Sequence, residues 1–231
     1  MLFYFKITQH EIMAEVGCVM WNCSGVMPTS STKEKIDFLE ITTKNEFDIL
    51  ILIETHHKDE NNLPTRLLRY KSKYHMIHTE ASDGDPYAGI IVFIKKDFRV
   101  LQSTELIKGR LLNMKIKHLA TGREYNVTPI YGYTAKDTSQ AKMKFITGLL
   151  EKTHDNTEQN LILGDFNFVD NDLDRTSQST TGMNQSDKTL SAPWVEFINK
   201  IKWICPTLLE KTIKKERCFH TYIHKEKPKA E

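Results

Sequence analysis

The amino-acid sequence predicts an α/β or α+β domain in which strands and helices pack in layers. Short apolar runs, typical of buried strands, alternate along the chain with segments of helical periodicity. The chain has 231 residues, of which 39% are hydrophobic, and this is enough to bury a core. Size and composition therefore fit one large domain or two small ones and argue against global disorder.

Five segments are predicted to be strands. The first two are continuously apolar, as in strands buried on both faces. The third alternates apolar and polar side chains and forms a hairpin with the fourth, and the fifth is short and buried. In chain order they are residues 47–53, 88–94, 111–117, 125–133 and 160–164, with the hairpin turn at Gly122.

Three segments have the pattern of amphipathic helices. Ser31 and Glu34 form a capping box ahead of apolar residues at helical spacing. A second helix carries its apolar residues between Ala141 and Leu150, and Pro193 at a first-turn position opens a third. The polar stretch 170–192 is predicted to be a surface loop.

Charge and composition exclude several classes of protein. Lys and Arg number 32 against 30 Asp and Glu, so the net charge of +2 excludes a strongly basic, histone-like binder. No run of eighteen apolar residues is present, and the apolar start is too short for a secretory signal. The four cysteines form no Cys-x-x-Cys pair. We therefore expect a nuclear or cytoplasmic protein with no membrane partner and reduced thiols.

Polar residues stand where the predicted strands end. Glu54 follows the strand 47–53, Asp165 and Asn167 follow the strand 160–164, Tyr131 lies near the end of another strand, and Asn22 follows the apolar segment Cys18 to Trp21. Because functional groups gather at strand ends, one shared site is expected. Two carboxylates could hold Mg²⁺, while amides and a phenol could hold phosphate oxygens and a water.

Each of these residues also has a plain structural interpretation. Glu54 could cap a helix or lie in a solvated turn, Tyr131 could belong to the core, and Asn22 precedes a natural Ser-Gly turn. The occurrence of all these polar residues at strand ends favours a shared functional site over the separate structural interpretations. Other motifs fail: the calcium-loop-like stretch 170–174 has Arg175 where glycine is needed, and no phosphate-binding or dinucleotide-binding glycine loop is present.

The residues at the strand ends lie in four short motifs, namely Trp-Asn-Cys-Ser-Gly around Asn22, Leu-Ile-Glu-Thr-His around Glu54, Pro-Ile-Tyr-Gly-Tyr around Tyr131 and Gly-Asp-Phe-Asn from Gly164 to Asn167. Together these motifs resemble the endonuclease/exonuclease/phosphatase family, over residues 16–224. On this interpretation, residues 1–15 are an N-terminal extension and residues 225–231 a charged tail. Two details, Glu-Thr-His at 54–56 and Leu-Asp-Arg at 173–175, are similar to the endonuclease domains of LINE-type (non-LTR) retrotransposons.

The resemblance implies a DNase I-like fold, a four-layer sandwich of two packed mixed β-sheets flanked by helices. It also implies a phosphodiesterase that uses Mg²⁺ or Mn²⁺ and nicks double-stranded DNA, with a reverse transcriptase on the same chain in a full-length product. By motif, Glu54 would bind the metal ion, and Asn22 would contact metal-bound water or phosphate. Asp165 would activate the attacking water, Asn167 and Tyr131 would hold phosphate oxygens, and Arg175 and Thr221 would contact DNA.

The resemblance also predicts a departure from the family pattern. The family carries a Ser-x-Ile-Asp motif and a final Ser-Asp-His motif, and residues 220–231 contain neither. The chain is therefore expected to lack its last strands, a catalytic Asp and a catalytic His, and to nick DNA weakly or not at all. Two alternatives stay open: a non-catalytic DNA- or protein-binding pseudo-enzyme, and a cellular phosphatase or phosphodiesterase of the same family.

Overall fold

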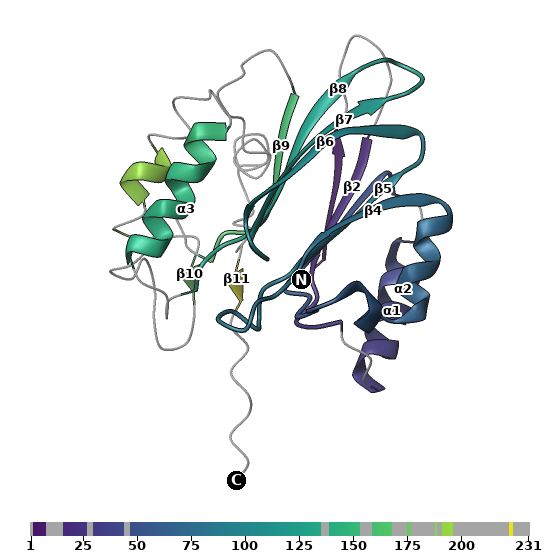
Figure 1. Ribbon diagram of the computed structural model, residues 1–231, viewed down its shortest axis with the longest axis horizontal. Coiled ribbons are helices and arrows are strands. Elements are labelled where there is room, and N and C mark those ends of the chain that lie inside the picture. The colour runs from purple at the N-terminus through teal and green to yellow at the C-terminus, as the bar shows by residue number, and fades with distance from the viewer. Residues whose placement is uncertain are drawn as a thin grey trace. The chain divides into compact units, whose positions relative to one another are not determined.

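The computed structural model divides the chain into two compact units. The first contains residues 1–132 and 157–165, and the second contains residues 133–156 and 166–231. Figure 1 shows the course of the chain. The residues that the structure describes are 2–7, 16–26, 30–43, 47–134, 139–152, 159–167, 175–176, 188, 191–195 and 222–223.

The first unit contains a five-stranded mixed sheet with the order β1-β2-β3-β5-β4. The neighbours β2 and β3 run parallel, and the three remaining pairs of neighbouring strands in this sheet are antiparallel. All five residues of β3 are buried, because its Ile and Leu side chains face apolar neighbours on both sides of the sheet. The strands are β1 (Leu2–Ile7), β2 (Val16–Asn22), β3 (Ile49–Ile53), β4 (Tyr74–Thr79) and β5 (Ile90–Lys95).

A four-stranded sheet completes the strands of the first unit, in the order β6-β7-β8-β9. The pair β8 and β9 is parallel, whereas β6, β7 and β8 form an antiparallel meander. Gly122 lies in the turn between β7 and β8 with a φ of 70°, which glycine adopts without steric cost. The strands are β6 (Phe98–Ile107), β7 (Leu111–His118), β8 (Glu124–Tyr131) and β9 (Gln159–Asp165).

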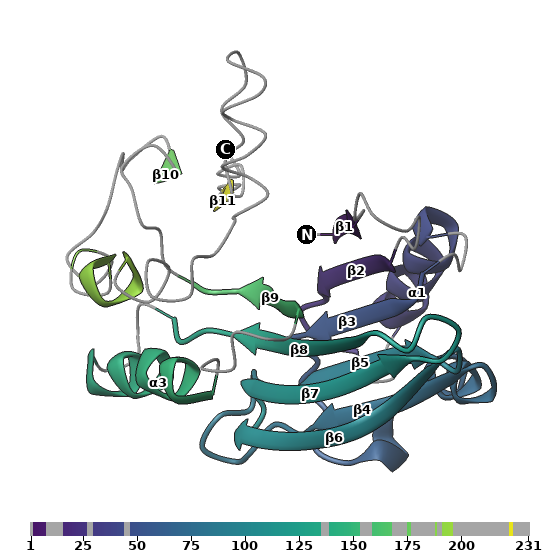
Figure 2. The same ribbon diagram turned by 90° about the horizontal axis from the view of Figure 1, so that it is seen from above.

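The two sheets pack face to face around one apolar core. Alternate side chains of β2, β3 and β5 meet those of β7 and β8, among them Met20, Ile51, Met114 and Val127. The opposite face of the first sheet is covered by helices, as Figures 1 and 2 show. These elements are α1 (Ser30–Thr43), η1 (Glu60–Asn62), α2 (Thr65–Leu68) and η2 (Arg69–Ser72). This arrangement confirms the predicted sandwich of mixed sheets flanked by helices.

The second unit contains helix α3 (Ser139–Lys152), helical residues at 191–195, and two short strands. Helix α3 buries Phe145, Ile146 and Leu149, as its periodicity predicts. Trp194 is buried and its ring packs against Phe166, with the ring centroids 4.9 Å apart. The strands β10 (Arg175–Thr176) and β11 (Tyr222–Ile223) pair in parallel.

All five predicted strands are confirmed as β3, β5, β7, β8 and β9, with ends that differ by at most two residues. In the two large sheets three strands were not predicted, and β2 was recognised only as the apolar segment Cys18 to Trp21 that precedes Asn22. β4 and β6 have side chains of mixed burial that follow no clean alternation, and β1 lies within the segment 1–15 assigned to an N-terminal extension, where it pairs with β2. None of the described helices is long and apolar enough to cross a membrane.

One local prediction agrees to within a residue and one needs correction. Helix α1 begins at Ser30, one residue before the serine of the predicted capping box, which is within the one or two residues to which helix ends are defined. The stretch 170–192, predicted to be loop throughout, contains β10, since Arg175 and Thr176 find strand partners 47 residues further along the chain. The predicted tail at 225–231 lies outside the described residues.

Candidate active site

Two pairs of parallel strands, one pair in each sheet, carry the predicted site residues at their carboxyl ends. In the first sheet Asn22, the last residue of β2, stands opposite Ile53, and Glu54 follows directly. In the second sheet Tyr131 and Asp165, the last residues of β8 and β9, stand opposite each other. Parallel strands end at the same edge of a sheet, so each pair delivers two polar side chains to one place.

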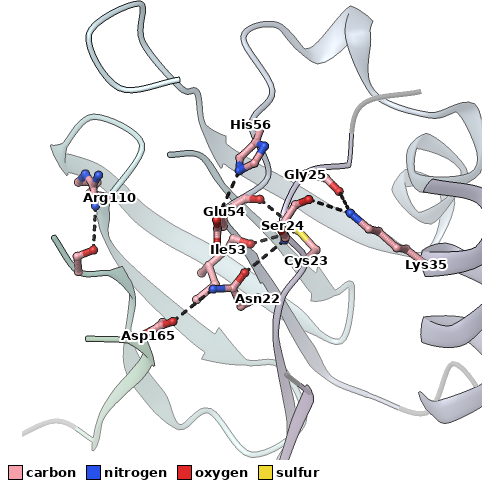
Figure 3. A network of polar contacts seen from close by, with 11 residues as sticks. Asn22, Cys23, Ser24, Gly25, Lys35, Ile53, Glu54, His56, Arg110 and Asp165 are labelled. Atoms are coloured by element: carbon pink, nitrogen blue, oxygen red, sulfur yellow. Dashed lines mark hydrogen bonds and ion pairs between the residues drawn. The ribbon is translucent and has the colours of Figure 1, made fainter. Parts of the chain in front are cut away.

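The packing of the two sheets joins these pairs. The Asn22 side-chain amide donates a hydrogen bond to Oδ2 of Asp165 at 3.2 Å, across 143 residues of sequence (Figure 3). The other end of the same amide, Oδ1, accepts from the backbone N–H of Ser24 at 3.2 Å. Asn22 is therefore fixed in orientation, and it fixes Asp165 in turn.

Glu54 lies on a tight loop with an unusual backbone. Its φ is 57°, and the φ of His56 is 59°, in the left-handed region that residues with a Cβ rarely adopt. Backbone hydrogen bonds hold the loop: Gly25 N–H donates to the carbonyl of Glu54 at 2.7 Å, and Thr55 N–H donates to that of Gly89 at 3.1 Å. Strain of this kind, worth about 1–3 kcal/mol per residue, is typical of functional sites.

Gly89 is required beside this loop. Its φ is +111°, and a Cβ at this position would lie 2.4 Å from Oγ1 of Thr55. A similar argument explains Gly164 of the Gly-Asp-Phe-Asn motif, where a Cβ would lie 2.0 Å from the carbonyl oxygen of Ile130. Gly89 thus makes room for the Thr55 side chain and Gly164 for the backbone of Ile130, and both glycines therefore support the positions of Glu54 and Asp165.

The Glu54 carboxylate is available for a ligand. Its side chain is 22% exposed, and Oε1 lies 3.7 Å from Nε2 of His56, too far for a hydrogen bond. That nitrogen is buried and lacks a hydrogen-bond partner among the described residues. Figure 3 shows Glu54 beside Asn22 and Asp165.

Tyr131 is buried at the same place. Burial is the main cause that raises the pKa of its hydroxyl far above the ordinary value, and the negative charges of Glu54 and Asp165 add to the rise, while Arg110 opposes it. The phenol therefore keeps its proton at any physiological pH and can serve only as a neutral hydrogen-bond donor or acceptor.

Two supporting groups were missed in the sequence. Buried Arg110 directly precedes β7 and contacts Tyr131. Buried His57 shares a hydrogen bond with Oγ1 of Thr55 at 2.6 Å, next to Glu54 in the sequence. His57 also faces His78, with 3.3 Å between Nε2 and Nδ1. The available signal was an arginine directly before the predicted strand 111–117; nothing in the sequence marked His57 as buried.

The remaining predicted residues are placed only in part. Asn167 belongs to the second unit and has a left-handed backbone with a φ of 54°, a conformation that asparagine tolerates. Arg175 opens β10, where its backbone stands opposite Tyr222. Thr221 lies outside the described residues. The structure therefore brings together Asn22, Glu54, Tyr131 and Asp165, all of which belong to the first unit.

The donor set suits a hard cation. Within the described residues there is no group of three or more His, Cys, Asp or Glu that could hold a metal ion. Mg²⁺ does not need such a cage, because it keeps several waters and binds through one or two carboxylates plus substrate phosphate. The partly exposed Glu54 carboxylate next to Asp165 meets that requirement.

A sandwich of two mixed sheets with carboxylates, an amide and a phenol at the ends of its parallel strands is the architecture of DNase I-like, metal-dependent phosphodiesterases. The chain belongs to the endonuclease/exonuclease/phosphatase family, which matches residues 21–199. Members of this family generally depend on divalent metal ions. No curated protein sequence matches the chain.

Solved structures share the fold at low sequence identity. The AP endonuclease LMAP from Leishmania major is 15% identical with a TM-score of 0.58, and the match covers 80% of this chain and 66% of that one. Truncated TDP2 from Caenorhabditis elegans is 16% identical with a TM-score of 0.54, covering 67% and 63%. The APE2 catalytic domain from Xenopus laevis is 19% identical with a TM-score of 0.51, covering 79% and 66%. The chain thus spans about two thirds of these structures.

Proposed function

We propose that this protein is a divalent-metal-dependent phosphodiesterase that nicks double-stranded DNA. We further propose that it is the endonuclease of a LINE-type retrotransposon. The observation that carries the proposal is the hydrogen bond between Asn22 and Asp165, which joins the strand ends of two sheets beside Glu54 and Tyr131. The Glu-Thr-His and Leu-Asp-Arg motifs at 54–56 and 173–175 support the retrotransposon assignment.

Glu54 would hold the metal ion, with Asn22 beside it. Mg²⁺ or Mn²⁺, when bound, would neutralise charge on the scissile phosphate. Glu54 supplies carboxylate oxygens without having to break a strong hydrogen bond to His56, since Oε1 lies 3.7 Å from Nε2 of that residue. The left-handed backbone at Glu54 sets the direction of this carboxylate before any ligand arrives.

The other residues would carry the reaction. Asp165 accepts a proton from a water molecule as the water oxygen forms a bond to phosphorus, and the bond from phosphorus to the 3′ oxygen breaks. The leaving oxygen takes a proton from solvent and becomes a 3′ hydroxyl, while the 5′ side keeps the phosphate. Tyr131, held neutral, donates its phenolic proton in a hydrogen bond to a phosphate oxygen that gains negative charge.

Three further residues are assigned from the motifs alone. We assign Asn167, the last residue of Gly-Asp-Phe-Asn, to the scissile phosphate, and we assign Arg175 and Thr221, which follow that motif in the expected order, to the DNA backbone and groove. A planar guanidinium suits phosphate contacts. We also propose that the 3′ hydroxyl primes a reverse transcriptase, on the same chain in a full-length product, and that the protein works in the nucleus or cytoplasm.

A nicking assay tests the proposal. Supercoiled plasmid is incubated with the protein in excess, with Mg²⁺ or with EDTA, beside Asp165→Asn and Glu54→Gln. We expect only slow relaxation of the plasmid with Mg²⁺, in keeping with the weak nicking that the sequence predicts, and a further loss of about 10²–10³-fold in either variant. His75→Gln, an exposed change on β4, is the matched control and should nick at the wild-type rate. Nicking that is equal in Asp165→Asn would refute the assignment.

The same preparations separate the alternatives. Hydrolysis of a small phosphate ester without plasmid nicking would indicate a cellular phosphatase. A folded chain that binds duplex DNA with a steep salt dependence, equally well in Glu54→Gln, and never nicks it would indicate a pseudo-enzyme.

A further inference from the structure

Arg110 contacts Tyr131 from three sides. Its backbone carbonyl accepts the N–H of Tyr131 at 2.8 Å, and its Nη1 donates to the carbonyls of Tyr131 at 3.3 Å and Gly132 at 2.8 Å. The guanidinium carbon lies 4.8 Å from the centroid of the Tyr131 ring, within the range of a cation–π contact. The end of β8 and the phenol are therefore held by one side chain.

Asp85 fixes the other end of this arginine. The Nε of Arg110 donates to Oδ2 of Asp85, and the Asp85 carbonyl accepts the N–H of Ala88 at 3.3 Å in the turn that leads to Gly89. The N–H of Gly89 in turn donates to Gly109 at 2.9 Å. The guanidinium is thus locked between the Asp85 turn and the strand that carries Tyr131, and Figure 3 shows it beside the site.

Stability alone does not account for a charged residue at this place. The Arg110 side chain is only 5% exposed, and a buried ion pair is often no more stabilising than apolar residues of the same volume. A planar guanidinium does what an apolar residue cannot: it donates to two carbonyls in one plane and lies against an aromatic face. What these contacts share is the position of Tyr131.

We propose that Arg110 is a positioning residue that acts through Tyr131, aiming the phenol at the phosphate, with Asp85 orienting the arginine. This inference rests on the proposed phosphodiesterase function, in which Tyr131 is the group that meets the substrate. Lysine at position 110 would keep the charge but could not make the two carbonyl contacts and the ring contact together.

A double-mutant cycle tests the functional part. Arg110→Lys should lower the kcat of nicking by about 10²-fold with KM unchanged, since small misplacements of a catalytic group cost this much. In the Tyr131→Phe background the same change should cost less than about 2-fold, because the group it positions is gone. Equal losses in both backgrounds would overturn the proposal and leave Arg110 a structural residue.

A second measurement does not need activity. With 3-fluorotyrosine at position 131, the ¹⁹F resonance should shift and broaden in Arg110→Lys. Arg66→Lys is the matched control, since Arg66 also pairs with carboxylates, Asp37 and Glu40, but on the helix-covered face; its resonance should match wild type. An unchanged resonance in Arg110→Lys would overturn the proposal. A shifted resonance in a protein that never nicks DNA would support the Arg110 contact and refute the phosphodiesterase function alone.

Discussion

The stability of the first unit should depend on pH through His57. This side chain is fully buried behind the Glu54 loop, and its pKa is lowered from the ordinary 6.5 to about 4. Burial is the largest cause and the neighbouring His78 adds to it, while Asp59 opposes it. A lowered pKa in a base means that the folded state prefers the neutral imidazole.

The sign and size follow from linkage. Because protonation favours the unfolded chain, the full contribution of His57 is present above pH 6.5, is lost progressively as the pH falls toward 4, and stays lost below that. One pKa unit corresponds to about 1.4 kcal/mol, so two and a half units correspond to about 3 kcal/mol. This is a large part of the stability of an ordinary domain.

Urea unfolding between pH 7.5 and 4 measures this effect. The free energy of unfolding of the wild type should fall by about 3 kcal/mol more than that of His57→Gln over this range, because the variant has no imidazole to protonate. Carboxylates with lowered pKa values lose stability in both proteins and cancel in the difference. His75→Gln, which removes an exposed imidazole, should follow the wild-type curve. Parallel curves for wild type and His57→Gln would refute the reasoning.

Three further predictions concern packing and chemistry. Gly164→Ala should lower the free energy of unfolding by about 1–3 kcal/mol or more, since its Cβ would meet the carbonyl oxygen of Ile130; unchanged urea midpoints would contradict this. Phe93→Ala, in the fully buried middle of β5, should cost about 3–5 kcal/mol by the same measurement, and a loss below 1 kcal/mol would show that the core collapses around it. Tyr131→Phe should keep the wild-type melting temperature within a few degrees yet nick about 10²-fold more slowly, and wild-type nicking would remove Tyr131 from the site.

The sequence was informative wherever the burial of a strand is evident from its own run of apolar residues. Glu54 and Asp165 could be found because each directly follows an apolar run whose burial is dictated by composition. That the two runs belong to different sheets could not be read locally. The hydrogen bond that joins Asn22 to Asp165 depends on how the sheets pack.

The supporting residues Arg110 and His57 could not be predicted from the sequence for a related reason. Arg110 and Tyr131 lie 21 residues apart and meet through backbone carbonyls, which leave no trace in side-chain periodicity. His57 follows two polar residues and reads as part of an exposed turn, yet it is fully buried because the left-handed backbone at Glu54 and His56 turns the chain inward. Backbone strain of this kind becomes apparent only in three dimensions.

The parallel pairing within each sheet has a consequence for the order of folding. Parallel neighbours cannot be joined by a tight turn, so β2 and β3 close over the segment that contains α1, and β8 and β9 close over the one that contains α3. Bringing such distant segments together costs loop-closure entropy, and this entropy is lost before the new contacts contribute any stability. The Asn22–Asp165 hydrogen bond, which spans 143 residues, must then be among the last to form. On the ribosome, the emerging chain would hold Glu54 in a nearly finished sheet long before Asp165 leaves the exit tunnel. The cluster of Asn22, Glu54, Tyr131 and Asp165 would thus be complete only after β9 has docked.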